Sequence, residues 1–201
     1  MKVITTSPMV KTYTLEEFWA LPEPEDHSKM ELIGGVLYMA PPPDEVHDYS
    51  TFNLSRLFFA HLESSGDRGV LLSPRAALWT GPDTYVEPDL FYISARTLRQ
   101  IDPKHRDRAD LVVEILSSSS ETYDRRTKSD TYAALRVREL WLVDPRRYTI
   151  EVRVLKKGAR AYGTGKLYHP GQRVRSVVLP GFSPAIDEIF LGVVRGPRKL
   201  G

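Results

Sequence analysis

The chain has 201 residues, of which 41% are hydrophobic and 27% are charged, and its formal net charge is +2. These are the proportions of a globular domain of ordinary size, so they exclude wholesale disorder. The absence of cysteine excludes disulfides and thiolate metal sites. No apolar run approaches the roughly 18 residues of a membrane span, and the N-terminus lacks an apolar signal core, so we expect a cytoplasmic protein without a membrane partner.

Charge is unevenly distributed along the chain. Acidic residues outnumber basic ones over residues 1–48, whereas basic residues outnumber acidic ones over residues 49–201. A basic majority of this kind favours binding to a polyanion such as a nucleic acid. An ordinary surface of mixed charge has the same composition, so charge alone leaves both interpretations open.

The first third of the chain predicts a short helix, a hairpin and a long helix. A capping box begins a helix over residues 14–21. Apolar runs on both sides of Gly34-Gly35 predict a hairpin over residues 30–39. An aspartate can cap a longer helix over residues 44–63. Its apolar face is expected to include Val46, Tyr49, Asn53, Leu57 and His61, widened by Phe52, Phe58, Phe59 and Leu62.

The middle of the chain predicts several strands and a crossover. Candidate strands cover residues 70–79 and 85–93, interrupted by Pro74 and Pro88. Residues 110–116 are apolar except for one glutamate, as is typical of a strand buried on both faces. A strand–helix–strand order implies a right-handed crossover between parallel strands. The other elements expected here are a polar, basic connection over 96–108, a helix over 121–135 and an apolar strand over 139–143.

The last third predicts more strands and fixes the fold class. Residues 148–155 alternate between apolar and polar, which indicates a half-exposed antiparallel strand. Two further strands are expected within 161–179, and a short helix over 186–190. The whole pattern predicts an α/β, or mixed α+β, fold in which helices flank a mixed β-sheet. We expect one domain over 13–190, with tails at 1–12 and 191–201.

The most informative residue is Glu114, which lies in the centre of the apolar strand Leu111–Leu116. A carboxylate at that position is desolvated, which is costly unless the group is paired, protonated or bound to a cation. Two roles explain the pattern equally well. Glu114 either forms a structural pair with an arginine on a neighbouring strand or serves as a metal ligand.

A second acid favours the metal interpretation. Glu87 and Asp89 flank Pro88, and period-two alternation points both the same way. If strand 85–93 lies beside strand 110–116, the carboxylates of Asp89 and Glu114 converge and repel each other. Mg²⁺ would remove that repulsion, because it binds one or two carboxylates together with waters and phosphate oxygens. The alternative for Asp89 is a turn or cap after the proline.

A lysine follows on the next predicted helix. Asp124, Lys128 and Tyr132 fall at i, i+4 and i+8, so they share one face. Facing the ends of the strands, Lys128 would reach a scissile phosphate or orient the attacking water. The alternative is a solvated pair between Lys128 and Asp124.

Glu31 and His47 are weaker candidates. Glu31 stands between hydrophobic residues of the hairpin, where it is either a further ligand, a group that holds a base in place or an exposed strand residue. His47 lies on the following helix, and the five histidines form no metal-ligand spacing. The sequence contains no nucleophile elbow, no Walker loop and no dinucleotide fingerprint. The serines at 117–120 are interpreted as a loop and helix cap.

Taken in order, these motifs resemble the Uma-two family of restriction-endonuclease-like proteins, a branch of the PD-(D/E)XK nuclease superfamily. The resemblance extends over about residues 13–190. The matching segments are 30–35, 39–43 with His47, 87–90, 111–117, Asp124 with Lys128 and Tyr132, 137–145, and 179–182.

The resemblance implies a restriction-endonuclease-like fold in which Asp89 and Glu114 ligate Mg²⁺ or Mn²⁺. The usual lysine of the superfamily would stand at Leu116, and similar proteins use a lysine on the next helix, here Lys128. Glu31 matches an acidic position in the first elements. His47, Glu87, Asp124 and Tyr132 are supporting candidates. The departures are Gly34 for a frequent aspartate, Asp48 for a glutamine and Ser118 for a proline.

The main functional hypothesis is metal-dependent hydrolysis of DNA phosphodiester bonds, with low sequence specificity because the contacts are to the backbone. The alternatives are a binding or regulatory protein with little or no cleavage, and an enzyme acting on a different phosphate ester. We also expect a homodimer through strands within 148–179. The basic residues proposed to grip DNA are Arg96, Arg99, Lys104, Arg106, Arg125 and Arg126.

Overall fold

The computed structural model describes residues 11–102 and 104–193, and it contains two β-sheets with helices against them. This confirms the predicted mixed α+β class. The predicted tails at 1–12 and 191–201 lie largely outside the described residues. The elements are α1 (Leu15–Trp19), β1 (Lys29–Ile33), β2 (Val36–Ala40), α2 (Glu45–Ser65), β3 (Val70–Leu72), β4 (Leu78–Thr80), β5 (Thr84–Val86), β6 (Leu90–Ile93), α3 (Ala95–Leu98), β7 (Leu111–Ile115), α4 (Glu121–Tyr123), the π-helix η1 (Asp124–Lys128), α5 (Ser129–Ala134), β8 (Glu139–Asp144), β9 (Thr149–Val154), β10 (Lys166–Tyr168) and α6 (Ile186–Ile189).

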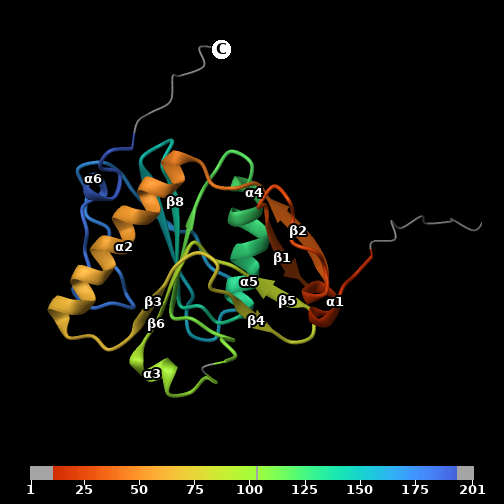
Figure 1. The fold of residues 1–201 in the computed structure, drawn as a ribbon. Helices are drawn as coiled ribbons and strands as arrows, with labels where there is room; N and C mark the ends of the chain where they lie inside the picture. Colours follow the sequence, from red (N-terminus) through yellow and green to blue (C-terminus); the bar gives the residue numbers. More distant parts are fainter. Residues whose placement is uncertain (1–10, 103, 194–201) are drawn as a thin grey trace, which may run out of the picture.

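The larger sheet has six strands in the order β10-β9-β8-β7-β6-β3. Strand β7 pairs antiparallel with β6 and parallel with β8, so the predicted neighbours and the predicted parallel crossover are both confirmed. Alternate residues of β7 face opposite sides. Val113 packs in the cluster that includes α2 and α6, and Val112 packs in the cluster that includes α5. The sheet is therefore covered on both faces, with α2 and α6 together on one side (Figure 1).

The smaller sheet has four strands in the order β2-β1-β5-β4. The hairpin β1–β2 forms around Gly34 and Gly35, whose positive φ values suit a tight turn. The candidate strands over 70–79 and 85–93 are each divided between the two sheets, which corrects the prediction of one sheet. Proline cannot donate a ladder hydrogen bond, so the chain leaves one sheet for the other near Pro74 and Pro88.

The long helix α2 begins at the side-chain cap of Asp44 and ends at Gly66, which is left-handed. Its buried face matches the predicted one at Asn53, Phe58 and Leu62 and differs from it elsewhere. Tyr49, Phe52 and Phe59 are 45%, 66% and 55% exposed, whereas the buried positions are Ser50, Asn53, Leu54, Phe58 and Leu62. A stripe of i, i+4 and i+8 positions is wide enough to cover the sheet, so the flanking aromatic residues remain outside it.

The predicted helix over 121–135 is interrupted by the π-helical turn η1. The wider turn changes which side chains share a face. Tyr123 lines one cavity, whereas Thr127 and Thr131 line another. Asp124, Lys128 and Tyr132 are all buried on one side, as predicted. Turns of this kind recur at functional sites.

The region 161–179 forms the single strand β10 and an isolated bridge between Arg173 and Ala185, where two strands were expected. Glycines at 163, 165 and 171 interrupt the run. The backbone N–H groups of Val177 and Val178 donate to the carboxylate of Glu139 rather than to a strand. The described core continues to Val193, which is buried. Every helix among the described residues is too short or too polar to span a bilayer.

Candidate active site

An acidic cavity of about 640 Å³ lies where the two sheets and the helix after β7 meet. Seven of the eight residues proposed from the sequence line it, and Tyr132 lies directly behind Glu114. The structure therefore brings all eight together from five separate segments. The seven lining residues are Glu31, His47, Glu87, Asp89, Glu114, Asp124 and Lys128.

Asp89 is fixed at the start of β6, where Leu90 opposite Val113 brings it beside Glu114 of β7. Its Oδ2 accepts a hydrogen bond from the backbone N–H of Ile115 at 2.7 Å and lies 3.1 Å from Nε2 of His47. Burial opposes ionisation, but the His47 hydrogen bond and the positive charge of Lys29 outweigh it. They hold the pKa of Asp89 well below its usual value. Asp89 is an anion at neutral pH.

Glu114 has the opposite electrostatic environment. It lies on the face of β7 toward α5, where its Oε1 accepts a hydrogen bond from the hydroxyl of Tyr132 and lies 2.7 Å from Nζ of Lys128. Burial raises the pKa of Glu114 to about 8; Lys128 opposes the rise, while the charges of Asp89 and Asp124 add to it. A raised pKa beside a lowered one is a pattern common at sites that bind metals or transfer protons.

Lys128 is surrounded by carboxylates. Its Nζ lies 2.7 Å from Glu114, 3.2 Å from Glu31 and 3.8 Å from Asp124, and the side chain is 1% exposed. Burial would lower its pKa, but Glu114 and Glu31 raise the pKa of Lys128 well above the usual value. The solvated pair with Asp124 that the sequence left open is therefore excluded. Lys128 is a buried ammonium that joins the helix to two sheets.

Glu31 connects the smaller sheet to this group. Its Oε1 accepts the backbone N–H of Glu87 at 2.7 Å, and its Oε2 accepts the hydroxyl of Tyr123 at 3.2 Å. With the Lys128 contact, every described partner of Glu31 is a cation or a hydrogen-bond donor. The interpretation of Glu31 as an exposed strand residue is wrong, because the residue is 2% exposed.

Glu87 carries an oxygen without a hydrogen-bond partner. Its Oε1 accepts the hydroxyl of Tyr85 at 3.1 Å, whereas Oε2 is buried without a partner and lies 3.7 Å from Nη1 of Arg75. Arg75 has a φ of 74°, an uncommon backbone conformation for a residue other than glycine. A buried oxygen without a partner is costly, so Glu87 suits a cavity that takes up a cation or donor.

Lys29 is a site residue that the sequence reasoning missed. It begins β1, and its Nζ donates to the carbonyl oxygen of Glu87 at 2.7 Å and lies 4.0 Å from Oδ1 of Asp89. The signal was present in the sequence, because Lys29 stands two residues before Glu31 and strand alternation puts both on one face. The sequence analysis also did not select Tyr123, whose hydroxyl donates to Glu31.

The oxygen donors of the cavity fit a hard divalent cation. Asp89 and Glu114 would hold it, since Mg²⁺ and Mn²⁺ take carboxylate oxygens and complete their coordination with water and phosphate. Among the described residues, no group of three or more acidic or histidine side chains is arranged as a ready metal cage. Two carboxylates with open positions are nevertheless the arrangement from which magnesium enzymes bind substrate phosphates.

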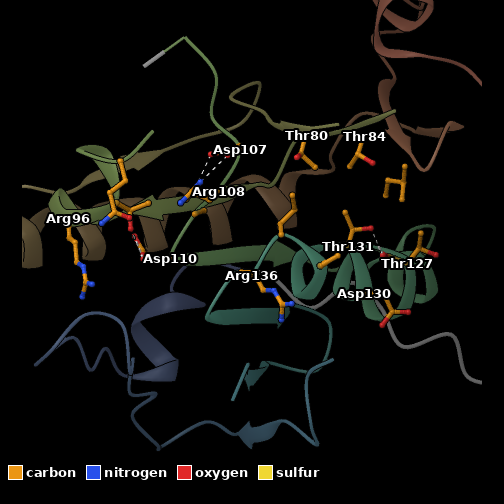
Figure 2. A pocket seen from close by; sticks show the side chains of 16 residues that line it. Thr80, Thr84, Arg96, Asp107, Arg108, Asp110, Thr127, Asp130, Thr131 and Arg136 are labelled. Carbon is orange, nitrogen blue, oxygen red and sulfur yellow. Dashed lines mark hydrogen bonds and ion pairs between the residues drawn. The ribbon is translucent and has the colours of Figure 1, made fainter. Parts of the chain in front are cut away.

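A second cavity, of about 990 Å³, is lined in part by Thr127, Asp130 and Thr131 of the helical segment after β7 (Figure 2). Its lining includes Arg96, Arg108 and Arg136, and it contains none of the eight candidate residues. None of the six basic residues proposed to grip DNA lines the acidic cavity, and Arg125 is instead paired with Glu121 and Glu151. The serines at 117–120 do line the acidic cavity, as a loop.

Comparison with known proteins supports the assignment of the fold. A crystal structure described as "a putative nuclease belonging to DUF820 from Anabaena variabilis ATCC 29413" has a TM-score of 0.70 with this chain at 18% identity. The match covers 89% of this chain and 97% of that one. At this identity the likeness shows a shared fold. No curated protein sequence matches the chain.

The family assignment comes from a family model. The model of the Uma2 family, described as "Putative restriction endonuclease", matches residues 15–188. This confirms the resemblance to the Uma-two family that the sequence motifs indicated. Because the match covers most of the sequence, the chain belongs to the Uma2 family of putative restriction endonucleases.

Proposed function

We propose that this protein is a metal-dependent endonuclease that hydrolyses phosphodiester bonds of DNA. The observation that carries the proposal is the convergence of Asp89 and Glu114 on neighbouring strands, in one cavity with the buried ammonium of Lys128. Membership of a family described as restriction endonucleases supports the same class of reaction.

The chain's own groups prepare the site for hydrolysis. Asp89 is kept ionised and oriented by the Ile115 N–H and by His47. Glu114 is oriented by Tyr132 and Lys128, so both carboxylates are fixed before substrate arrives. A bound Mg²⁺ or Mn²⁺ would supply polarisation of the phosphate and a water of lowered pKa.

Substrate recognition follows from what surrounds the cavity. The lining of the cavity includes prolines 41–43 and serines 117–120. We infer contacts to the DNA backbone and little sequence specificity. We also infer a homodimer contact through strands within 148–179, where β10 is an edge of the larger sheet, and a cytoplasmic location.

The test is cleavage of supercoiled plasmid and of single-stranded DNA with Mg²⁺, with Mn²⁺ and with EDTA. Asp89→Asn and Glu114→Gln keep the shape of each side chain, and each is expected to reduce cleavage by about 100-fold or more. Lys157→Gln is the matched control, because Lys157 is exposed and lines neither cavity. Cleavage that survives Glu114→Gln unchanged would refute the assignment.

A second candidate is a nuclease-fold protein that binds nucleic acid with little or no cleavage. Leu116 supports it, because a buried leucine stands where the superfamily carries its usual lysine. In that case the wild-type chain would show salt-sensitive DNA affinity, no turnover with either metal and no metal uptake in a titration.

A further inference from the structure

The ammonium of Lys128 is held by two buried carboxylates. Its Nζ lies 2.7 Å from Glu114 and 3.2 Å from Glu31, with Asp124 further away at 3.8 Å. Although Lys128 lines the cavity, its side chain is only 1% exposed. A phosphate could reach Nζ only by displacing one of these carboxylates, which leaves a buried charge unpaired.

Lys29 is placed differently. Its side chain is 24% exposed, and Nζ makes one hydrogen bond, to the carbonyl oxygen of Glu87 at 2.7 Å. The carboxylates of Glu31 and Asp89 lie 3.8 Å and 4.0 Å away, outside hydrogen-bond distance. Lys29 therefore has N–H groups available within the cavity, next to the oxygen of Asp89 that accepts no described hydrogen bond.

The other cations of the cavity do not match this position. His47 is engaged with Oδ2 of Asp89 at 3.1 Å. Arg75 is 61% exposed and lies nearest Glu87, so it stands at the rim. Of the described lysines and arginines that line the cavity, Lys29 is the one that is both partly exposed and adjacent to Asp89.

We propose that Lys29 is the residue that contacts the reacting phosphate, and that Lys128 is a positioning residue that holds Glu114 and Glu31. This inference rests on the proposed nuclease function. A compact ammonium beside a metal-bound phosphate neutralises charge as it develops on the phosphate oxygens. In this proposal the lysine that contacts the phosphate is Lys29 of β1, in the smaller sheet.

The first test is binding rather than cleavage. A labelled 12-base-pair DNA duplex is titrated by fluorescence anisotropy with Ca²⁺ in place of Mg²⁺, at several salt concentrations. Lys29→Gln is expected to weaken binding about tenfold and to reduce the slope of log affinity against log salt by about one. Lys29→Arg should restore both quantities, and Lys157→Gln should leave both unchanged. Equal affinity and slope for Lys29→Gln and wild type would overturn the proposal.

The second test is chemical modification of the intact protein. Reductive methylation followed by mass spectrometry should label Lys29 and not Lys128, and the DNA duplex with Ca²⁺ should protect Lys29. Methylation of Lys29 that DNA leaves unchanged would contradict a phosphate contact there.

Cleavage separates this inference from the proposed function. With Mg²⁺ or Mn²⁺, Lys29→Gln is expected to lower kcat by about 100-fold with a small change in KM. A wild-type protein that binds DNA without cleaving it contradicts the nuclease proposal. The phosphate contact would still stand if Lys29→Gln loses affinity. A Lys29→Gln variant that cleaves and binds like wild type contradicts only the role of Lys29.

Discussion

Nζ of Lys128 lies 2.7 Å from Oε1 of Glu114, and the two side chains are 1% and 2% exposed. Lys128 belongs to the π-helical turn after β7, and Glu114 belongs to β7 itself. A pair buried this deeply is costly to form, and it is far more costly to break by removing one partner. The stability of the fold and the geometry of the candidate active site therefore both depend on the contact between Lys128 and Glu114.

Removing the ammonium should destabilise the fold strongly. Lys128→Met leaves Glu114, Glu31 and Asp124 buried without their shared cation, so we expect the free energy of unfolding to fall by about 3–5 kcal/mol. Urea unfolding followed by circular dichroism measures it. Lys157→Met, on an exposed lysine, should change it by less than about 0.5 kcal/mol.

The double variant Lys128→Met/Glu114→Gln checks the physical cause. At pH 9, above the raised pKa of Glu114, it removes one buried charge of each sign, so part of the lost stability should return. If the double variant loses more free energy of unfolding than the two single variants lose when their losses are added, the uncompensated-charge explanation is contradicted.

Metal binding should raise stability through the same cavity. At a Mn²⁺ concentration about 100 times its dissociation constant, the free energy of unfolding is expected to rise by about 2.7 kcal/mol. The increase should be absent in Asp89→Asn, because this carboxylate is a proposed ligand. Differential scanning calorimetry at matched ionic strength, with Mn²⁺ and with EDTA, provides the measurement. The same increase in wild type and Asp89→Asn would place the metal elsewhere.

Glu139 should matter for stability and not for chemistry. It is fully buried outside the acidic cavity, where its carboxylate accepts hydrogen bonds from the Trp141 indole N–H, the Ser176 hydroxyl and the N–H groups of Val177 and Val178. Glu139→Gln turns an acceptor into a donor against these groups, so we expect a loss of about 2–4 kcal/mol.

The control for Glu139 is Glu63→Gln, which changes an exposed glutamate near the end of α2. Chemical denaturation gives both stabilities, and cleavage per folded molecule should be unaffected in both variants. A Glu139→Gln protein as stable as wild type would show that the loop over 176–182 does not need the carboxylate.

The ion pairs of Glu121 should make the free energy of unfolding depend on pH. Its carboxylate accepts hydrogen bonds from Arg146, Arg147 and Arg125; these outweigh burial and lower the pKa of Glu121 to about 2. A lowered pKa in the folded state contributes stability above the ordinary value of 4.5, and the contribution disappears as pH falls toward 2. Since these groups are partly exposed, we expect the Glu121 network to contribute about 1 kcal/mol to the free energy of unfolding.

The measurement compares wild type with Glu121→Gln by urea unfolding between pH 7 and pH 3. The difference in stability should be constant down to about pH 4.5 and should shrink below it. A difference that grows as the pH falls would have the opposite sign and would exclude this network as its cause.

The sequence was most informative where a charge interrupted an apolar strand. Glu114 could be selected because a glutamate between valine and isoleucine has few explanations, and the crossover then located Lys128 on the next helix. Asp89 required a pairing of strands, and the pairing of β6 with β7 is as expected. These inferences depend on local pattern and on the limited menu of strand connections.

Other features depended on contacts that local pattern cannot encode. The two sheets are separated by crossings near Pro74 and Pro88, and a proline predicts a break without saying where the chain goes next. The exposure of Phe52 and Phe59 depends on the width of the sheet that α2 covers. The role of Glu139 depends on a loop more than thirty residues away in sequence.

The division into two sheets has a consequence for the integrity of the acidic cavity. Lys29 and Glu31 belong to the smaller sheet, whereas Glu114 belongs to the larger one. Lys128 connects the two sheets through its ion pairs with Glu31 and Glu114. Loosening of the smaller sheet would separate the side chains of the proposed active site while the six-stranded core remained folded. Loss of activity on mild heating should therefore precede global melting.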